Sequence, residues 1–175
     1  FIGRERELND ASEKLESAKL LTLIGPGGTG KTRLSIQIGA EQLARFKHGA
    51  WLIELAPISD AAYIIPAIAS VFEIRAVQNF PLIHFVIDYL RAKEILLILD
   101  NCEHLVEASA EIANQLLHEC PQLKIIANSG GMNPPACARA AAKVLAEAGL
   151  GDTTIGVVTG DDLLRLCKRH GVKIQ

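Results

Sequence analysis

Short apolar runs alternate with amphipathic stretches along the chain, and this alternation predicts βαβ units. The run Ile95–Leu99 is apolar at every position, which is typical of a strand buried on both faces of a sheet. The expected strands are 20–24, 50–55, 95–99, 123–127 and 154–158, with a short edge strand at 172–174; the expected helices are 31–46, 60–72, 81–92, 106–119, 134 to about 149 and 161–169. The pattern therefore predicts an α/β, three-layer, doubly wound fold with a mainly parallel sheet of about five strands.

Polar residues and prolines mark the ends of these elements. Asp60 is suited to cap a helix, and Pro66 inside that helix predicts either a kink or two short helices. Pro81 suits the first turn of the next helix. The Asn128–Asn133 segment contains two glycines and is expected to be a loop between the fourth strand and an alanine-rich helix.

Composition and charge exclude several classes of protein. The chain has 175 residues, of which 49% are hydrophobic and 22% charged, with 18 basic and 20 acidic side chains. These proportions fit one globular domain and argue against collagen-like, coiled-coil and disordered chains. A net charge of −2 gives no attraction to nucleic acid, and no apolar run approaches the roughly 20 residues that span a bilayer. We therefore expect a cytoplasmic protein without direct contact to nucleic acid or membrane. Its four cysteines form no Cys-x-x-Cys pair, so we expect reduced thiols, and its start at Phe1 suggests a fragment.

The segment GPGGTGKT matches the phosphate-loop pattern G-x-x-x-x-G-K-[ST] at every fixed position, and it lies between an expected strand and an expected helix. Glycines let successive backbone N–H groups turn toward an anion, and the helix N-terminus adds its unpaired amides. Lys31 is expected to reach the β- and γ-phosphates of a nucleotide, and the Thr32 hydroxyl to bind Mg²⁺. The expected nucleotide-binding residues are Gly25, Pro26, Gly27, Gly28, Thr29, Gly30, Lys31, Thr32 and Arg33. The alternative is a flexible glycine-rich turn that only resembles the pattern.

A carboxylate at the end of a neighbouring buried strand completes such a site, because it holds the water shell of the metal ion. Asp100 directly follows Ile95–Leu99 and is the candidate; the alternative is that it caps the next turn. Many ATPases of this class place a second acid straight after that aspartate, but Asn101 stands there. Glu103 is then the candidate general base, or else a solvated loop residue. Adenine is favoured over guanine because no Asn/Thr-Lys-x-Asp sequence follows the loop. The predicted ligands are ATP or ADP and Mg²⁺, with at most a slow ATPase activity.

Five motifs together resemble the signal-transduction ATPases with numerous domains (STAND), in the branch of bacterial LuxR- and AfsR-type regulators. They are FIGREREL, GPGGTGKTRL, WLIELAPISD, LLILDNCEHL and LKIIANS, and they cover residues 1–129. The resemblance implies an NB-ARC-like switch in a transcriptional regulator fragment, closed with ADP and able to assemble or activate attached modules with ATP. It also implies that Ile2, Gly3 and Arg4 lie beside the adenine; Arg4 could instead be a surface residue at a helix start. Gly130 stands where this family usually has the γ-phosphate-sensing arginine of Thr-Ser-Arg.

From residue 126 onward the sequence changes character. The segments ANSGGMNP and VVTGDDL are similar to the acyclic terpene utilisation (AtuA-like) family, over residues 126–175. We therefore expect a chimera, engineered or natural, that forms one P-loop NTPase-like domain over 1–175. In it, 1–129 is the STAND ATPase-like part and 130–175 is an AtuA-like part that completes the sheet. Three functions stay open: a Mg-ATP/ADP switch with slow or absent hydrolysis, a folded scaffold with a relic phosphate loop, and an enzyme contributed by the second part. Self-association and further partner modules are also compatible with the resemblance.

Overall fold

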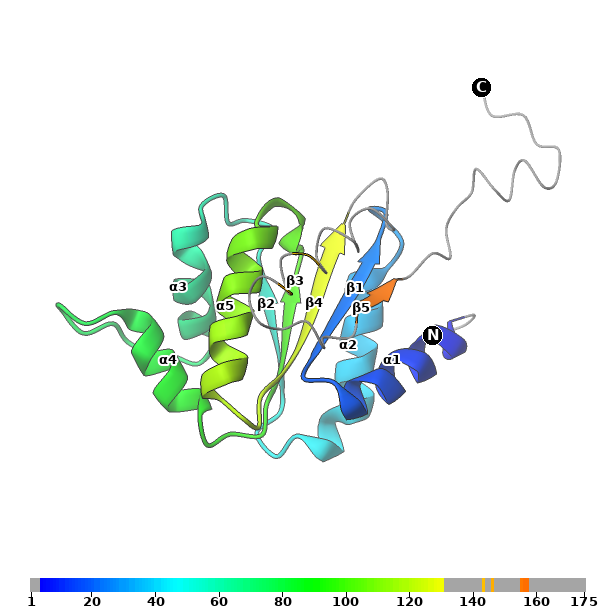
Figure 1. Cartoon of the computed structure of the whole chain (residues 1–175), viewed down its shortest axis with the longest axis horizontal. Helices are drawn as coiled ribbons and strands as arrows, with labels where there is room; N and C mark the ends of the chain where they lie inside the picture. The colour runs from blue at the N-terminus through cyan, green and yellow to red at the C-terminus, as the bar shows by residue number, and fades with distance from the viewer. Residues whose placement is uncertain (1–3, 131–142, 144–145, 147–154, 158–175) are drawn as a thin grey trace, which may run out of the picture.

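The computed structural model describes residues 4–130, 143, 146 and 155–157. Its strands form one parallel sheet in the order β2-β3-β4-β1-β5 (Figure 1). The strands are β1 (Leu20–Gly25), β2 (Ala50–Glu54), β3 (Leu96–Asp100), β4 (Lys124–Gly130) and β5 (Ile155–Val157). The described helices are α1 (Glu5–Ser17), α2 (Lys31–Gln42), α3 (Ile64–Val71), α4 (Leu82–Leu90) and α5 (Val106–Glu119), with 3-10 turns η1 (Leu43–Arg45), η2 (Ala61–Tyr63) and η3 (Cys102–His104). The predicted parallel α/β fold is confirmed.

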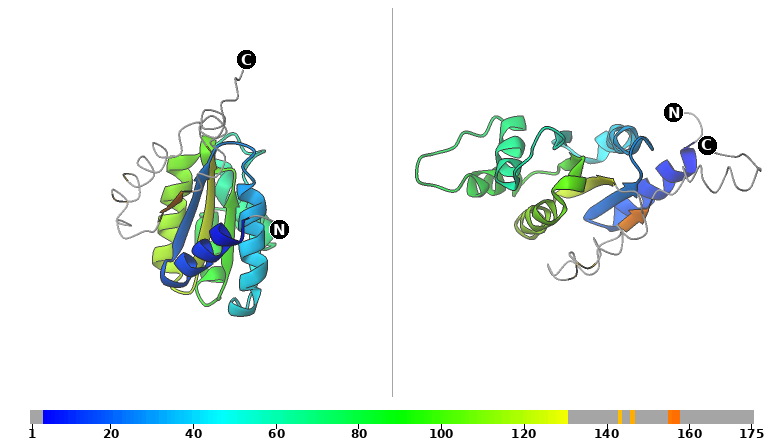
Figure 2. Two further views of the ribbon diagram at one scale, coloured as in Figure 1. Left: turned by 90° about the vertical axis from the view of Figure 1, so that its right-hand side faces the viewer. Right: turned by 90° about the horizontal axis from the view of Figure 1, so that it is seen from above.

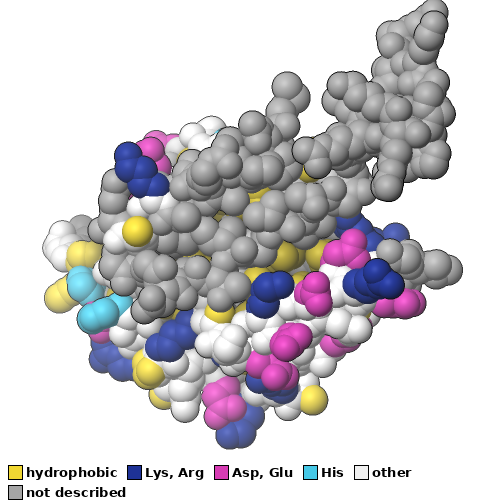
Figure 3. Space-filling view, turned by 45° about the vertical axis from the view of Figure 1, so that its right-hand side comes forward, with side chains coloured by type: hydrophobic (Ala, Val, Ile, Leu, Met, Phe, Trp, Pro, Cys, Tyr) yellow, Lys and Arg dark blue, Asp and Glu magenta, His cyan; other side chains and the backbone are white. Residues whose placement is uncertain are grey.

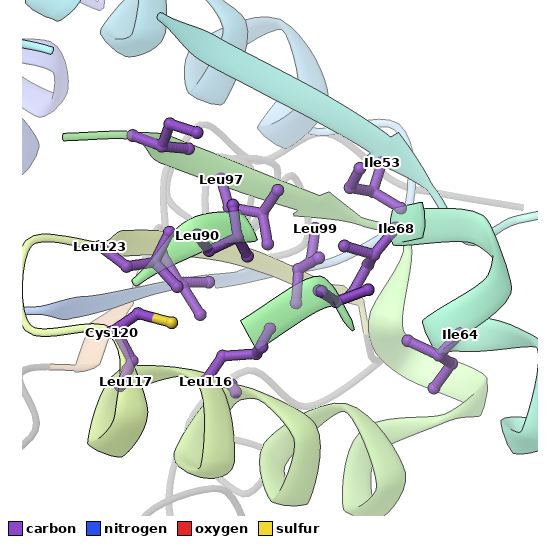
Figure 4. Packing of buried hydrophobic residues seen from close by; sticks show 14 of the residues in the cluster. Ile53, Ile64, Ile68, Leu90, Leu97, Leu99, Leu116, Leu117, Cys120 and Leu123 are labelled. Atoms are coloured by element: carbon purple, nitrogen blue, oxygen red, sulfur yellow. The ribbon is translucent and has the colours of Figure 1, made fainter. Parts of the chain in front are cut away.

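Helices cover both faces of the sheet and produce the three layers (Figure 2). Successive side chains of a strand point to opposite faces, so each strand contributes to two cores. Leu96 and Ile98 pack in the core beneath α1 and α2, whereas Leu97 and Leu99 pack in the core beneath α3, α4 and α5. Figure 4 shows this second core, where Leu97 and Leu99 face Leu116 and its neighbours on α5.

The apolar pattern did not predict the helix α1, whose start was anticipated only by the alternative that Arg4 begins a helix. Its buried residues Leu8, Ala11 and Leu15 lie three and four positions apart, which is the spacing of one helical face. Charged residues fill the positions between them and lower the mean hydropathy of the segment. The signal was therefore the spacing rather than the number of apolar residues.

The segment around Pro66 forms two short helices rather than a kinked one. The Asp60 carboxylate accepts a hydrogen bond of 2.9 Å from the Ala62 N–H and caps η2. The helix α3 then begins at Ile64, so Pro66 falls in its first turn, where an N–H would have no intrahelical partner. Pro81 is the residue before α4 rather than its first helical position.

The strand β4 is longer than predicted and replaces the first half of the expected loop at 128–133. Asn128, Ser129 and Gly130 continue the strand and pair with residues of β1. Polar residues are tolerated in this buried position because the Asn128 amide finds hydrogen-bond partners on two neighbouring elements. Residues 131–133, the expected helices at 134–149 and 161–169, and the expected edge strand at 172–174 lie outside the described residues.

The other end of β4 is also anchored by a polar side chain. The partly buried ammonium of Lys124 donates hydrogen bonds to the carbonyl oxygens of Leu15, Glu16 and Ala18, of which the last two measure 2.8 and 3.0 Å. Carbonyls at the end of a helix lack intrahelical partners, so Lys124 closes the C-terminus of α1. Burial lowers the pKa of this lysine, and the nearby Arg45 adds to the effect while Glu16 opposes it.

The described surface carries both signs of charge. On the face shown in Figure 3, acidic and basic side chains are intermingled, in keeping with a net charge of −2. None of the helices in the described part of the chain combines the length and apolar character needed to cross a bilayer.

The predicted fifth strand is present, because β5 pairs with β1 at Thr22, Leu23 and Ile24.

Candidate functional site: the phosphate loop and the end of strand β3

The phosphate loop lies at the carboxyl edge of the sheet, between β1 and α2. Because the strands are parallel, the ends of β1, β3 and β4 meet at this edge (Figure 1). The backbone is left-handed at Gly28 and Gly30, with φ of +79° and +75°, a conformation that glycine adopts without strain. These two residues curl the segment between Gly25 and Lys31 back on itself, so the loop is not extended.

The Lys31 side chain is held against this loop. Its ammonium donates hydrogen bonds of 2.9 Å to the carbonyl oxygens of Gly25 and of Pro26, and the residue is only 9% exposed. The Thr29 hydroxyl donates a further bond of 2.9 Å to the Pro26 carbonyl. The loop therefore holds a positive charge close to its backbone, as an anion-binding loop requires.

Thr32 and Asp100 lie in direct contact across the space between α2 and β3. The Thr32 hydroxyl is 2.8 Å from Oδ1 and 2.9 Å from Oδ2 of the Asp100 carboxylate. Asp100 is the last residue of β3, and its carboxylate points to α2 rather than capping η3. A hydroxyl and a carboxylate supply the oxygen ligands that Mg²⁺ prefers. These two residues fit a magnesium ion that also takes oxygens from phosphate and water.

Asn128 joins this pair to the body of the protein. Its amide nitrogen donates hydrogen bonds of 2.7 Å to Asp100 Oδ1 and 2.8 Å to Ser35 Oγ. The Ser35 hydroxyl in turn donates to the Thr32 carbonyl at 2.9 Å. Asn128 is 1% exposed, and within the described residues its Oδ1 has no hydrogen-bond partner. This residue was expected in a loop and was not predicted as part of the site; the signal was a lone amide directly after the apolar run of β4.

Metal binding by protein side chains alone is not supported at this edge. Among residues 4–130 and the other described positions, no three His, Cys, Asp or Glu side chains lie together in a way that could hold a metal ion. Because Mg²⁺ usually keeps several waters and binds through one or two carboxylates plus phosphate oxygens, this arrangement suits a metal that arrives with a nucleotide.

Arg4 reaches the phosphate loop from the start of α1. Its guanidinium Nη1 donates a hydrogen bond to the carbonyl oxygen of Thr29. A methyl group added at Gly30 would lie 3.4 Å from the same nitrogen, at ordinary contact distance, so the requirement for glycine there comes from its φ of +75°. Arg4 is thus both the residue that precedes α1 and a contact of the loop. Ile2 and Gly3 lie outside the described residues.

The two remaining candidates, Glu103 and Arg33, are exposed. Glu103 lies in η3, whose first residue, Cys102, is buried in the core beneath α3, α4 and α5. The ring nitrogen Nε2 of His104 lies 2.6 Å from the Ile58 carbonyl oxygen, which fixes the other end of this turn. Arg33 lies in the first turn of α2. The functions expected for Glu103 and Arg33 stay predictions.

The thiol next to this edge is not a reactive group. Cys102 and Cys120 are both free and buried. Burial raises the pKa of the Cys102 thiol from 9.0 to about 12, and the nearby Asp100 carboxylate acts in the same direction. Burial also raises the pKa of Cys120. A neutral, enclosed thiol is a poor nucleophile and a poor metal ligand, so Cys102 belongs to the core.

Two family models match the chain. A model described as an AAA domain matches residues 13–132, more than half of the chain. A second model, described as acyclic terpene utilisation family protein AtuA, matches residues 103–174, less than half of the chain. The two matches overlap over residues 103–132.

Curated relatives occur in mycobacteria. An uncharacterized protein of Mycobacterium tuberculosis is 36% identical over 129 residues, which are 74% of this chain and 33% of that protein. A protein of the same organism that bears the name of an HTH-type transcriptional regulator is 34% identical over 115 residues, which are 66% of this chain and 13% of that protein. The chain thus spans a third or less of the length of these relatives.

Solved structures share the fold at low sequence identity. Cdc6p from Pyrobaculum aerophilum has a TM-score of 0.68 at 16% identity, over 89% of this chain and 45% of that chain. A Walker-type ATPase of Pyrococcus abyssi has a TM-score of 0.63 at 17% identity, over 100% of this chain and 60% of that chain. A STAND protein with a tetratricopeptide repeat sensor from Pyrococcus horikoshii has a TM-score of 0.55 at 15% identity, over 91% of this chain and 23% of that chain. These similarities establish the fold.

Proposed function

The chain belongs to the AAA domain family of P-loop ATPases, and from this premise we propose that it binds ATP or ADP together with Mg²⁺ at the carboxyl edge of its sheet. The observation that carries the proposal is the curled loop between Gly25 and Lys31, which holds an ammonium group against its backbone. The contact between Thr32 and Asp100 beside the loop supports a metal ion at the same place.

Each residue has a definite part in this proposal. The ammonium of Lys31 exchanges its two neutral carbonyl acceptors for phosphate oxygens, whose negative charge makes the hydrogen bonds stronger. Thr32 holds Mg²⁺ through its hydroxyl, and Asp100 holds it through water. A bound Mg²⁺ neutralises charge on the β- and γ-phosphates. Gly25–Gly30 supply backbone amides, and Arg33 lies beside them at the start of α2.

The adenine end of the nucleotide is proposed from the resemblance to STAND ATPases. In that family the opening motif, which Ile2, Gly3 and Arg4 match in this sequence, lies against the base. The hydrogen bond between Arg4 and the Thr29 carbonyl supports this proposal, because it brings the beginning of the chain to the phosphate loop. The same contact connects α1 to the loop, so a change in the bound nucleotide can alter the position of α1.

A switch with slow or absent hydrolysis is the activity we propose. Asn101 occupies the position after Asp100 and cannot accept a proton in the way a carboxylate does. Gly130, which pairs with Gly25, supplies no side chain where the STAND family usually has an arginine. Glu103 remains the first sequence-based candidate for the base. A site that binds metal and phosphate but hydrolyses slowly keeps a bound nucleoside triphosphate intact for long periods, as a switch must.

The domain organisation is part of the proposal. We take residues 1–129 as a STAND ATPase-like part and 130–175 as an AtuA-like part of one chimeric domain. The end of the AAA match at residue 132 lies close to this junction, and the pairing of β5 with β1 supports a shared sheet. A second candidate is a folded scaffold whose phosphate loop no longer binds nucleotide, since the second family model matches only residues 103–174 and leaves the loop out.

Calorimetry separates these two candidates. We expect the folded 175-residue chain to bind both Mg-ADP and Mg-ATP, and Lys31→Ala to abolish binding. Lys47→Ala is the matched control, because Lys47 is an exposed lysine paired with Glu94 at the opposite edge of the sheet. Nucleotide at 100 times its dissociation constant should stabilise the wild-type protein by about 2.7 kcal/mol. Absence of both binding heat and stabilisation, in folded protein, would establish the scaffold.

A further inference from the structure

A row of side chains crosses the sheet at the level of the phosphate loop. In a parallel sheet, register partners on neighbouring strands point to the same face. Leu23 on β1 is the register partner of Asn128 on β4, and Glu54 on β2 is the register partner of Asp100 on β3. The bond of 2.7 Å between Asn128 and Asp100 joins the two halves. The row therefore runs Leu23, Asn128, Asp100, Glu54.

The row faces α2 and the phosphate loop. Ile53 and Leu55, on either side of Glu54, are buried in the core beneath α3, α4 and α5. Because side chains alternate along a strand, Glu54 points to the other face. Asp100 points to that face as well, since it contacts Thr32 at the start of α2. Glu54 thus shares a face with the groups that we propose to hold phosphate and metal.

Glu54 is the outermost member of this row and its carboxylate is not engaged. It is exposed, it ends β2, and within the described residues it makes no hydrogen bond or ion pair. Neighbouring strands lie about 4.8 Å apart, so its backbone is one strand from the metal-binding aspartate. A general base acts within hydrogen-bond reach of the attacking water or through one further water, and Glu54 lies on the strand next to Asp100 and on the face that carries the phosphate loop.

The turn that carries Glu103 leads in the other direction. Cys102 is buried beneath α3, α4 and α5. Its thiol donates a hydrogen bond to the carbonyl oxygen of Leu99, which is on β3 and belongs to the same core. His104 contacts the Ile58 carbonyl in the segment after β2. The chain after Asp100 is therefore drawn away from the face on which α2 lies.

From this placement we infer that Glu54 is the general base for hydrolysis of a nucleoside triphosphate, an inference that rests on the proposed nucleotide binding. The oxygen of a water molecule forms a bond to the γ-phosphorus, while the bond from that phosphorus to the bridging oxygen breaks. The bridging oxygen keeps the electron pair, and the proton of the water passes to the Glu54 carboxylate. The products are a nucleoside diphosphate and inorganic phosphate.

Three variants of the full chain test the inference: Glu54→Gln, Glu54→Asp and Glu111→Gln. Phosphate release gives kcat, and calorimetry with Mg-ADP gives the dissociation constant. Loss of a general base lowers kcat by about 10²–10⁴-fold. We expect this loss in Glu54→Gln with an unchanged dissociation constant, partial activity in Glu54→Asp, and the wild-type kcat in Glu111→Gln. Glu111 is exposed on α5 at the opposite face, so Glu111→Gln controls for the loss of one surface charge.

Failure of this inference differs from failure of the proposed function. If Glu54→Gln hydrolyses ATP at the wild-type rate, or if the wild-type chain binds nucleotide without hydrolysing it, Glu54 is not the base and nucleotide binding stands. If the folded wild-type chain binds neither ATP nor ADP, the proposed function itself is wrong. Glutamine matches glutamate in shape at an exposed position, so equal melting temperatures of wild type and Glu54→Gln show that folding is intact.

Discussion

The substitution Asn128→Asp changes one atom in the centre of the site. The amide nitrogen that donates a hydrogen bond of 2.7 Å to Asp100 Oδ1 becomes a carboxylate oxygen at the same place. Two acceptors then face one another where a donor and an acceptor did before. Because Asn128 is 1% exposed, water cannot separate the two groups. The substitution should therefore act through charge and hydrogen bonding while leaving the shape of the core almost unchanged.

The magnitude follows from these contacts. A hydrogen bond to a charged group contributes about 1.5–3 kcal/mol, and this one is lost. Two unit charges about 4 Å apart repel by about 4 kcal/mol at an effective dielectric constant of 20. We expect Asn128→Asp to lower the free energy of unfolding by about 5.5–7 kcal/mol at pH 8, a large part of the 5–15 kcal/mol that is usual for a domain.

The loss should shrink as the solution becomes more acidic. Two carboxylates in contact share a proton in the folded state, which raises the pKa of the pair above the value of about 4 in the unfolded chain. The folded state then binds more protons than the unfolded state above pH 4. Relative to the wild type, the variant loses stability as the pH rises, by up to about 1.4 kcal/mol per pH unit. At pH 5 the shared proton restores a hydrogen bond between the two side chains.

Urea denaturation of wild type, Asn128→Asp and Asn128→Ala at pH 5 and pH 8, with EDTA to exclude metal ions, measures these differences. Asn128→Ala removes the hydrogen bonds to Asp100 and Ser35 without adding a charge, and it also removes the Oδ1 that lacks a partner among the described residues. We expect it to cost about 1–3 kcal/mol at both pH values. The reasoning is refuted if Asn128→Asp is as stable as Asn128→Ala at pH 8, or if its deficit is the same at both pH values.

Further predictions concern stability at other positions. Replacing Lys124 by Met keeps the apolar stem but removes three hydrogen bonds to the end of α1, so the free energy of unfolding should fall by about 1–3 kcal/mol in urea titrations; an unchanged midpoint would contradict the cap. Cys102 stays neutral in the folded state up to about pH 12 while its unfolded thiol ionises near 9.0, so folding loses about 1.4 kcal/mol per pH unit between these values. Cys102→Ala should remove that part of the alkaline slope, and a slope identical to that of the wild type would exclude the effect. Peptide mapping after iodoacetamide treatment at pH 8 should find Cys102 unmodified in the native protein.

The phosphate loop could be predicted from the sequence because its pattern is local. Its four fixed positions each have a conformational or chemical requirement that a short stretch of residues meets by itself, and the strand before it and the helix after it are equally evident. Asp100 was predictable for a similar reason, since the uniformly apolar run before it defines a buried strand that ends there.

The rest of the site depends on registers that no single segment encodes. Asn128 is hydrogen-bonded to Asp100, which lies 28 positions earlier in the chain. Glu54 is next to Asp100 because the parallel register of β2 and β3 makes these two residues partners. An amide after an apolar run suggests the end of a strand as readily as a buried contact, which is why the loop at 128–133 was predicted too early. Arg4 is a comparable case, because its contact with Thr29 depends on where α1 packs.

Lys124 and Asn128 stand four positions apart on β4, so they project from the same face, with Ile126 between them in the core beneath α1 and α2. A slip of this strand by a single position against its neighbours would turn both polar groups into the opposite apolar layer and expel Ile126 from its own. The Lys124 ammonium and the Asn128 amide would then be buried among apolar side chains without hydrogen-bond partners. The central strand therefore tolerates one alignment, and the two polar residues at its ends fix the position of the edge that carries the phosphate loop.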